Sequence, residues 1–260
     1  MIIYEHNLDP IAFKIFDLKI YWYSLSYIFG FLFFIYYSKF QINKQIINLK
    51  VKIVDDFVSW AIISIILGGR LGYVFFYNLE LYISNPIEIF KIWKGGMSFH
   101  GALIGMIILI ILYSFKKRIN FYELTSLVVS SCPVGIFLGR IANFINGELV
   151  GIPTQNQWGV LYSLSDIPRH PSQIYEAFFE GIILFLILFF FLRSSLNKNF
   201  ACFSIFLIFY GIFRFFLEYF REPDVQIGYI AGNLSMGQIL SIPMIIFGFI
   251  FLKKWTKIVN

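Results

Sequence analysis

Charged residues are scarce in this sequence. Only 14% of its 260 residues are Asp, Glu, Lys or Arg, whereas soluble proteins average about 25%. Hydrophobic residues make up 58% and include 33 Phe and 16 Tyr, more than a protein core requires. Most of the surface must therefore face lipid and not water, which excludes a soluble globular protein.

Cysteine is nearly absent as well. Cys132 and Cys202 both lie in apolar stretches, without a CxxC motif or a Cys/His cluster. This excludes a disulfide scaffold and indicates no metal site, and we expect both cysteines to pack as small hydrophobic residues. The formal net charge of +6 is spread over short loops. It therefore indicates orientation in a membrane and not nucleic-acid binding.

The N-terminal segment does not resemble a secretory signal. Residues 1–17 contain Glu5, Asp9 and Asp17 and lack a basic stretch followed by a small-residue cleavage site. We therefore expect no removable signal peptide.

Seven apolar runs are long enough to cross about 30 Å of hydrocarbon. They cover approximately residues 20–38, 57–77, 97–115, 121–138, 174–192, 200–220 and 236–252. This pattern predicts an all-α integral membrane protein built as a bundle of about seven transmembrane helices. No internal repeat, low-complexity tract or soluble linker divides the chain, so we expect a single polytopic membrane domain over 1–260.

The distribution of Lys and Arg predicts the orientation, because basic residues in short loops stay on the cytoplasmic side. Twelve follow the first, third, fifth and seventh spans: Lys39, Lys44, Lys50, Lys52, Lys116, Lys117, Arg118, Arg193, Lys198, Lys253, Lys254 and Lys257. Seven lie on the other side, over longer segments: Lys14, Lys19, Lys91, Lys94, Arg140, Arg169 and Arg221. We therefore expect an outer N-terminus and a cytoplasmic C-terminus.

Ionisable residues within the spans gather in one leaflet. A charge near the bilayer centre costs about 2.5–3.5 kcal/mol, so such a residue indicates function by default. With the predicted orientation, five spans place polar residues in the outer half: Arg70, His100, Arg140, Glu176, Arg214, Glu218 and Arg221. The last three follow at i, i+4 and i+7 and share one helix face. The inner halves are nearly uniform Phe, Ile and Leu, which argues against a polar path across the membrane.

The longest outer loop begins with the densest polar stretch of the sequence, GRIANFINGELVG over Gly139–Gly151. Arg140, Asn143 and Asn146 recur at helical i+3 spacing and would share a face. Arginine donates two parallel hydrogen bonds to a phosphate and stays charged when desolvated. Arg140 and Arg214 could therefore clamp one phosphodiester.

Turn residues punctuate the same region. Gly139, Gly147 and Gly151 would let the backbone approach a bound group or turn sharply. Pro171 is near an expected helix start, and Glu176 would lie in the first turn, where a carboxylate complements the helix dipole.

Several of these residues have a purely structural alternative. Arg214 and Glu218 could be a buried pair that holds the bundle together. Arg70 could extend its side chain to the interface. His100 could be an ordinary interface histidine.

Other features are explained most simply by membrane packing. Tyr21, Trp22 and Tyr23 fit an aromatic belt. The glycines of Gly68–Gly72 would allow close helix packing. Glu180 and Lys91 are expected to be structural or solvated charges.

The motifs together resemble the prolipoprotein diacylglyceryl transferases of bacterial inner membranes. The resemblance covers nearly the whole chain and rests on Trp22–Tyr23, Gly68–Tyr73, Gly95–Gly101, Gly139–Gly151, His170–Glu176, Arg214–Asp224 and Ser235–Gln238. It implies a transferase that moves the diacylglyceryl group of phosphatidylglycerol to the lipobox cysteine of a prolipoprotein. A thioether forms and glycerol phosphate leaves, as the first step of lipoprotein maturation. The implied location is the bacterial inner membrane, with the active site toward the periplasmic face.

The resemblance also implies residue roles. It makes Arg140 essential, Arg214 a second arginine that contacts the phospholipid, and Glu218 the partner of Arg214. His100 falls on the histidine proposed as the base. Substrate-binding positions fall on Tyr23, Asn143, Asn146, Glu148 and Gly151. Two departures are visible: Ala142 stands where the family usually has glycine, and the segment 152–168 is shorter than in some relatives.

These residue types fit the implied chemistry. A thiol with a pKa of about 8.5 is a weak nucleophile while protonated, so a base or a positive field near His100 would help it attack the glycerol carbon. Two arginines would stabilise the phosphate as the carbon–oxygen bond breaks. His100 could take the proton or only orient the substrate, and a neighbouring carboxylate or a water could be the base instead.

The implied reaction needs no redox carrier or nucleotide, so we expect no metal and no organic cofactor. The expected partners are phosphatidylglycerol, prolipoprotein signal peptides with a lipobox cysteine, and membrane lipid.

Three other functions compete with the transferase. A lipid scramblase or transporter would need polar residues in both halves of its spans. An intramembrane protease would need a nucleophile motif or paired aspartates beside His100, and the sequence has neither. A purely structural membrane protein would leave the polar stretch at Gly139–Gly151 without a role.

Overall fold

The computed structural model describes residues 4–77, 79–163, 165–194, 200–223, 228–230 and 233–259, which are mainly helical. Lys198 and Asp224 lie outside these residues, as do the side chains of Lys254 and Lys257. The chain divides into two compact units, one formed by 1–37 with 126–260 and the other by 38–125. Each unit is described by itself, and the expectation of one polytopic domain over 1–260 stays a prediction.

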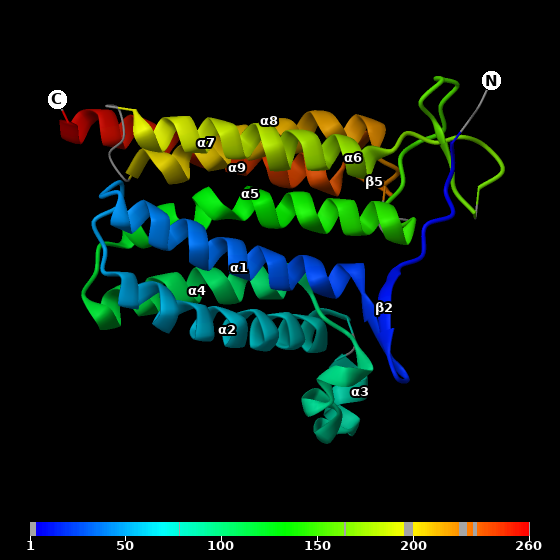
Figure 1. The fold of residues 1–260 in the computed structure, drawn as a ribbon, viewed down its shortest axis with the longest axis horizontal. Coiled ribbons are helices and arrows are strands. Elements are labelled where there is room, and N and C mark those ends of the chain that lie inside the picture. Colours follow the sequence, from blue (N-terminus) through cyan, green and yellow to red (C-terminus); the bar gives the residue numbers. More distant parts are fainter. Residues whose placement is uncertain are drawn as a thin grey trace. The chain divides into compact units, whose positions relative to one another are not determined.

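The first unit contains most of the helices (Figure 1). Its helices are the first part of α1 (Trp22–Asn43), most of α5 (Phe121–Asn146), α6 (Ser172–Glu176), the π-helix η3 (Ala177–Ile183), α7 (Leu184–Arg193), α8 (Phe200–Leu217), η4 (Glu218–Phe220) and α9 (Met236–Val259). The segments α6, η3 and α7 follow one another without a break, so they form one continuous span.

Short strands accompany these helices. They are β1 (Tyr4–Glu5), β2 (Ile11–Ile15), β3 (Leu18–Tyr21), β4 (Val160–Leu161), β5 (Tyr229–Ile230) and β6 (Leu234–Ser235). Strand β1 pairs in parallel with β4, and β2–β3 and β5–β6 pair antiparallel. The β1–β4 pair ties the N-terminal segment to the loop that follows α5.

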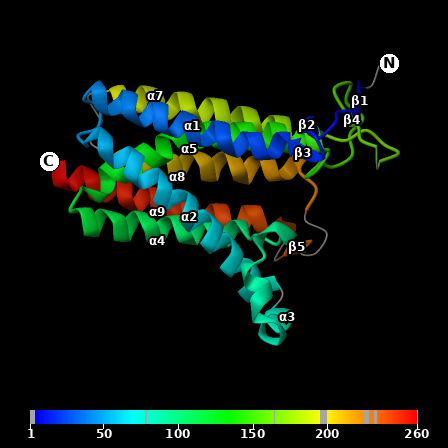
Figure 2. The ribbon, with the colours of Figure 1, turned by 60° about the horizontal axis from the view of Figure 1, so that its bottom comes forward.

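Small residues allow close packing within the first unit. Helices α8 and α9 run side by side (Figure 2). A Cβ on Gly211 of α8 would lie 2.8 Å from Ile245 of α9. Likewise, a Cβ on Gly181 of η3 would lie 2.6 Å from the Cβ of Phe137 on α5. The second approach brings α5 against the π-helix, one turn before Arg140.

The second unit is built on α2 (Val51–Tyr77) and α4 (Phe99–Lys117), joined by α3 (Leu79–Ser84), η1 (Pro86–Phe90) and η2 (Ile92–Lys94). A Cβ on Gly72 would lie 2.7 Å from the Cα of Gly101, and a Cβ on Gly68 would lie 3.2 Å from the Cα of Gly105. The expectation that Gly68–Gly72 allows close helix packing is thus confirmed, because side chains there would force α2 and α4 apart.

Six helices of the described residues are long and apolar enough to cross a membrane. They are Trp22–Asn43, Phe99–Lys117, Phe121–Asn146, Ser172–Arg193, Ala201–Phe220 and Met236–Lys253. They match six of the seven predicted runs. The remaining run, 57–77, lies in α2, which is helical over 27 residues but is not among the six. The helix count of seven and the outer N-terminus stay predictions.

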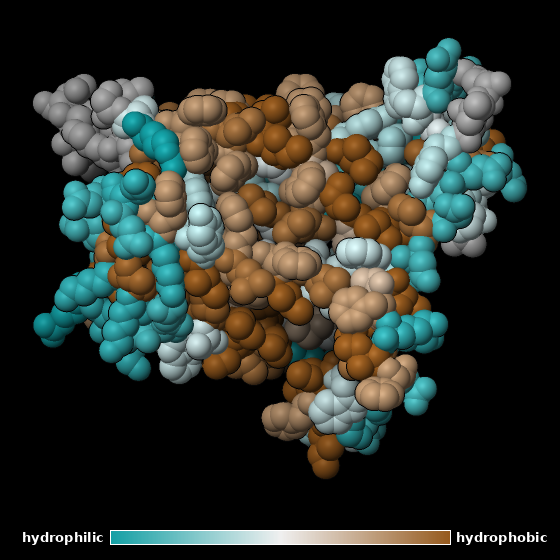
Figure 3. All heavy atoms as spheres, viewed as in Figure 1, coloured by the Kyte–Doolittle hydropathy of each residue, from teal (hydrophilic) through white to brown (hydrophobic). Residues whose placement is uncertain are grey.

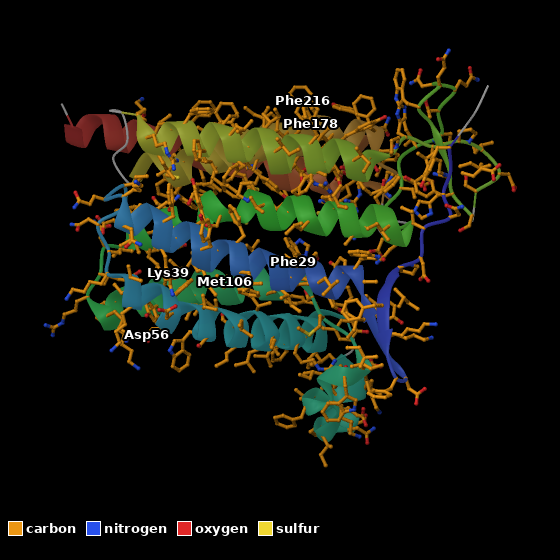
Figure 4. All side chains as sticks on the ribbon, viewed as in Figure 1. Phe29, Lys39, Asp56, Met106, Phe178 and Phe216 are labelled. Atoms are coloured by element: carbon orange, nitrogen blue, oxygen red, sulfur yellow. The ribbon has the colours of Figure 1, made fainter. Side chains whose placement is uncertain are left out.

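The surface of these helices is apolar. Figure 3 shows hydrophobic residues along the helices and hydrophilic residues toward their ends. Phe178 on η3 and Phe216 on α8 point outward and are 46% and 60% exposed (Figure 4). Such exposure of large apolar side chains fits contact with lipid, so the chain is a multi-pass membrane protein.

The two cysteines have different surroundings. Cys202 on α8 is buried, as expected of a packing residue, whereas Cys132 on α5 is exposed. The expectation that both are packed inside is therefore wrong for Cys132, since an apolar run in a span can face lipid as well as protein.

Candidate active site

Arg140 and Arg214 meet on one buried carboxylate. The Nη1 atom of Arg140 lies 3.0 Å from Oε2 of Glu176, and the Nη1 atom of Arg214 lies 2.5 Å from Oε1 of the same residue. Glu176 has no exposed surface. Helices α5, α6 and α8 therefore deliver the two arginines and their shared counter-charge to one place, as two arginines on one phosphate would require.

A second carboxylate stands beside the same arginines. Glu180 is also fully buried, and its two oxygens lie 3.6 Å from Nη2 of Arg140 and from Nη1 of Arg214. Neither oxygen has a hydrogen-bond partner among the described residues. Glu180 lies in the π-helix η3, a rare widened turn that is frequent at functional sites.

Glu218 completes the cluster. It forms an ion pair with Nη2 of Arg214 and accepts a hydrogen bond of 2.6 Å from the hydroxyl of Ser235. A Cβ on Gly237 would lie 2.5 Å from the carboxyl carbon of Glu218, so only glycine fits at the start of α9. The expected Arg214–Glu218 pair is confirmed, and it is anchored by Ser235 of β6 as well as from α8.

Opposite charges balance in this cluster, which we call the arginine–glutamate cluster. Its members are Arg140, Arg214, Arg221, Glu176, Glu180 and Glu218, and Nη1 of Arg221 lies 3.5 Å from Glu176. Charges in a membrane are expensive unless they are paired. The side chains of Arg140 and Arg214 keep 16% and 14% of their surface exposed, whereas the two central glutamates keep none. The reachable side of the cluster is therefore cationic.

Glu176 and Glu180 have roles that their sequence positions do not reveal directly. Glu176 was expected in a first helical turn, but α6 begins at Ser172 and has no acidic residue there, so the expected dipole contact is wrong. Its charge is balanced by arginines instead. Glu180 was expected to be either structural or solvated, and the second alternative is wrong because the residue is fully buried. The sequence did contain an indication of their role, because two acidic residues at i and i+4 are rare in an apolar span.

The residues Asn143, Asn146 and Glu148 bind one another. Asn143 and Asn146 donate amide hydrogen bonds of 2.7 and 3.2 Å to the same oxygen of Glu148. Gln173 donates a hydrogen bond of 2.6 Å to the backbone oxygen of Glu148. Gly147, with φ +67°, makes the turn at which α5 ends. These contacts close the end of α5 next to the start of α6.

Gly151 lies where two backbone segments pass closely. Its N–H donates a hydrogen bond of 3.0 Å to the carbonyl of His170, and a Cβ there would lie 2.5 Å from the carbonyl oxygen of Phe220. Arg169 donates a hydrogen bond of 3.0 Å to the carbonyl of Gly151 and pairs with Glu222 at 2.7 Å. The absence of a side chain at position 151 is therefore explained by backbone packing.

His170 and the N-terminal His6 border this loop. His170 is buried, which lowers its pKa from the ordinary value, and its Nδ1 lies 3.1 Å from the hydroxyl of Tyr175. Nε2 of His6 lies 2.6 Å from the carbonyl oxygen of Phe144, near the end of α5. The contact of His6 could not be predicted from the sequence, because His6 and Phe144 are far apart in the chain and no motif links them.

Two further predicted residues, Tyr23 and His100, are on other helices. Tyr23 on α1 packs edge to face against Tyr27, with a centroid distance of 5.4 Å, and is 37% exposed, which fits an aromatic belt. His100 is exposed in the first turn of α4, in the second unit. The structure thus brings Arg140, Arg214 and Glu218 together, while the role of His100 stays a prediction.

Arg70 holds the loop between α3 and α4, over residues 86–96, through hydrogen bonds. It is only 4% exposed and donates hydrogen bonds to the backbone oxygens of Glu88, Ile89, Lys91, Gly95 and Gly96. These contacts support a structural role for Arg70, and the extension of its side chain to the membrane interface stays a prediction. A guanidinium with five donors satisfies carbonyls that the short 3-10 helices η1 and η2 and the turn after them leave free.

The described residues contain no group of three or more His, Cys, Asp or Glu side chains that could hold a metal ion. The clustered functional groups are instead cations and carboxylates that balance one another, and amides that close a loop. Such an arrangement can bind an anion and stabilise negative charge.

Comparison with known proteins agrees with this arrangement. A family model described as prolipoprotein diacylglyceryl transferase matches residues 10–254. The chain is 51% identical to a protein of Rickettsia felis and 52% identical to one of Rickettsia typhi, each over 245 residues that cover 93% of this chain and 95% of the relative. Both relatives are named phosphatidylglycerol–prolipoprotein diacylglyceryl transferase. The chain therefore belongs to the prolipoprotein diacylglyceryl transferase family.

Proposed function

We propose that this transferase moves the diacylglyceryl group of phosphatidylglycerol to the lipobox cysteine of prolipoproteins, with Arg140 and Arg214 holding the lipid phosphate. The observation that carries this proposal is that both arginines meet on Glu176 and keep part of their side-chain surface exposed, whereas Glu176 keeps none. A guanidinium held by a carboxylate on one edge can still donate hydrogen bonds from another edge. Glu218 fixes Arg214 in place for this task.

The reaction is a substitution at carbon. The sulfur of the cysteine attacks the carbon of the diacylglyceryl group that is bonded to the phosphate oxygen. A carbon–sulfur bond forms there, and the bond between that carbon and the phosphate oxygen breaks. Glycerol phosphate leaves with the bonding electrons, and a base takes the proton of the thiol. The two arginines stabilise the charge that collects on the phosphate oxygens, and fixed donors of this kind act most strongly where water is excluded.

The other expected residues take supporting roles in this proposal. His100 is the base or orients the substrate. Tyr23, Asn143, Asn146, Glu148 and Gly151 bind substrate or shape its site. For the asparagines and Glu148, the hydrogen bonds that close the end of α5 support a role in holding Arg140 on its helix, one turn before Asn143.

We place the enzyme in the bacterial inner membrane, with the site toward the periplasm. The asymmetry of Lys and Arg between the loops supports this orientation. The substrates support it too, because a prolipoprotein presents its signal peptide and lipobox cysteine at the outer face after export.

The test is a transfer assay with purified protein in detergent, phosphatidylglycerol and a lipobox peptide. Mass spectrometry should detect a diacylglyceryl thioether that disappears when the peptide cysteine is replaced by serine. Arg140→Lys and Arg214→Lys should each lower the rate by about 100- to 1,000-fold, the usual effect of losing a donor to a developing oxyanion. Lysine keeps the charge but lacks the planar fork that offers one edge to a carboxylate and another to a phosphate.

Arg169→Lys is the matched control, because Arg169 lies in the adjoining loop and pairs with Glu222 outside the cluster. We expect it to retain transfer within a few-fold. Normal transfer by both cluster variants, inserted at normal levels, would refute the phosphate role. Lipid binding without any product would instead favour a lipid carrier.

A further inference from the structure

Glu180 is the least satisfied carboxylate of the arginine–glutamate cluster. Glu176 has ion-pair partners at 2.5 and 3.0 Å, and Glu218 has an ion pair and a hydrogen bond from Ser235. Glu180 has only the two contacts of 3.6 Å, which are too long for hydrogen bonds, although it has no exposed surface. A buried carboxylate that lacks hydrogen bonds is costly to keep ionised.

The groups around Glu180 leave it as the one that can change its charge. Arg140 faces it from α5, Glu176 lies one turn earlier, and Arg214 and Tyr210 face it from α8. The charge of Arg221, which follows η4, also acts on it. Arginine stays protonated, and the tyrosine hydroxyl already carries its proton. Glu176 is held ionised by closer arginine contacts. A proton that enters the cluster therefore goes to Glu180.

Substrate binding changes the charge balance of the cluster. Three arginines and three glutamates balance one another in the free protein when all are ionised. The following step rests on the proposed function, in which a phosphodiester with one negative charge binds Arg140 and Arg214. That ligand would leave one uncompensated negative charge among buried groups, which is unfavourable at low dielectric.

We propose that Glu180 takes up one proton from solvent when the phosphodiester of phosphatidylglycerol binds, and releases it when the phosphate product leaves. The lipid and the proton then enter together, and the charge of the cluster stays constant. Protonation also removes a competitor for the guanidinium N–H groups, which become available to the phosphate. Glu180 is thus a positioning residue that acts through Arg140 and Arg214.

Proton-coupled binding has a measurable signature. Over the pH range in which Glu180 is ionised in the free protein but protonated in the complex, the apparent Kd for the lipid should rise about tenfold for each unit by which the pH is raised. Glu180→Gln, which is neutral at every pH, should bind the lipid with an affinity that no longer varies in this way. Its affinity at high pH should equal or exceed that of the unmodified protein.

The experiment is titration calorimetry of the purified protein in detergent with phosphatidylglycerol, in two buffers of different ionisation enthalpy. The difference between the observed enthalpies gives the number of protons taken up. At a pH at which Glu180 is ionised in the free protein, we expect about one proton per lipid for the unmodified protein and none for Glu180→Gln. Glu222→Gln is the matched control, because Glu222 pairs with Arg169 outside the cluster, and it should still take up one proton.

Two results would overturn the inference. One is lipid binding by the unmodified protein without proton uptake, which needs no variant to fold. The other is unchanged uptake in Glu180→Gln. If Arg140 and Arg214 do not bind the lipid phosphate, the result is different. Arg140→Lys and Arg214→Lys would then bind the lipid as tightly as the unmodified protein, whatever number of protons is taken up.

Discussion

Replacement of Arg70 by lysine should loosen the loop between α3 and α4. Three of the hydrogen bonds of Arg70 are short: 2.6 Å to the carbonyl of Glu88, 2.8 Å to Ile89 and 2.6 Å to Gly95. They start from three different nitrogen atoms of a planar fork. Lysine has a single nitrogen and can keep at best one of these positions, so two charge-assisted hydrogen bonds are lost.

The magnitude follows from these two bonds. A hydrogen bond to a charged group contributes about 1.5–3 kcal/mol, so Arg70→Lys should lower the free energy of opening the loop by about 3–6 kcal/mol. Because every 1.4 kcal/mol is about a factor of ten, the opening equilibrium should shift by about two to four orders of magnitude. The turn amides of Lys91, Lys94 and Gly95 report on this opening, since each donates a backbone hydrogen bond within the loop.

The assay is hydrogen–deuterium exchange of the protein in detergent, followed by mass spectrometry of peptides that cover residues 86–97. Lys94→Gln is the control. It removes a surface ion pair with Glu88 from a side chain that is 56% exposed, and such pairs are worth about 0–1 kcal/mol. If Arg70→Lys exchanges no faster than Lys94→Gln, Arg70 does not hold the loop, and the accounting of its hydrogen bonds is wrong.

Three further predictions follow from individual contacts. Gly151→Ala should lower the thermal midpoint of unfolding by an amount equivalent to about 1–3 kcal/mol, because its Cβ would meet two backbone carbonyl oxygens. The control is Gly139→Ala, whose Cβ would meet nothing within 4 Å. It should not lower the midpoint in the same fluorescence melt. Hydrogen bonds from its two lysine partners lower the pKa of Glu88 from 4.5 to about 2, so the loop should keep this stabilisation above about pH 4.5 and lose it as the pH falls toward about 2. Carboxyl NMR titration measures that pKa, and a midpoint near 4.5 would contradict the ion pairs. Gly181→Ala should slow diacylglyceryl transfer without preventing membrane insertion, because its Cβ would push Phe137 and α5, which carries Arg140, away from η3. A transfer rate equal to that of the unmodified protein would show that this contact does not position Arg140.

Composition and apolar run length predicted the membrane class and most of the helices, but not where every helix ends. The fourth predicted span, 121–138, stops where the apolar run stops, whereas α5 continues to Asn146. Backbone hydrogen bonding ends a helix at a turn, here Gly147 with φ +67°, and not at the edge of the hydrophobic run. The i+3 spacing of Arg140, Asn143 and Asn146 already indicated this continuation.

The candidate site could be predicted only in part. Arg140 and Arg214 were expected in one leaflet because charges in spans are rare and costly, and the structure places both on Glu176. The burial of Glu180 between them could not be predicted, because it depends on the close approach of α5 to η3 at Gly181. The carbonyl partners of Arg70 could not be predicted either, because they come from the folded segment over 86–96.

The sequence by itself determined that this chain lies in a membrane, which segments are apolar enough to span it, and which residues carry charge there. These properties are local, since the transfer of a segment into lipid depends on its own side chains. Only the tertiary structure decided which distant groups meet: Glu176 with both arginines, Glu218 with Ser235, and Glu180 with no hydrogen bond. Ion pairs act over a few ångströms between residues that are distant in the chain, so they are set by helix packing, which no local pattern specifies.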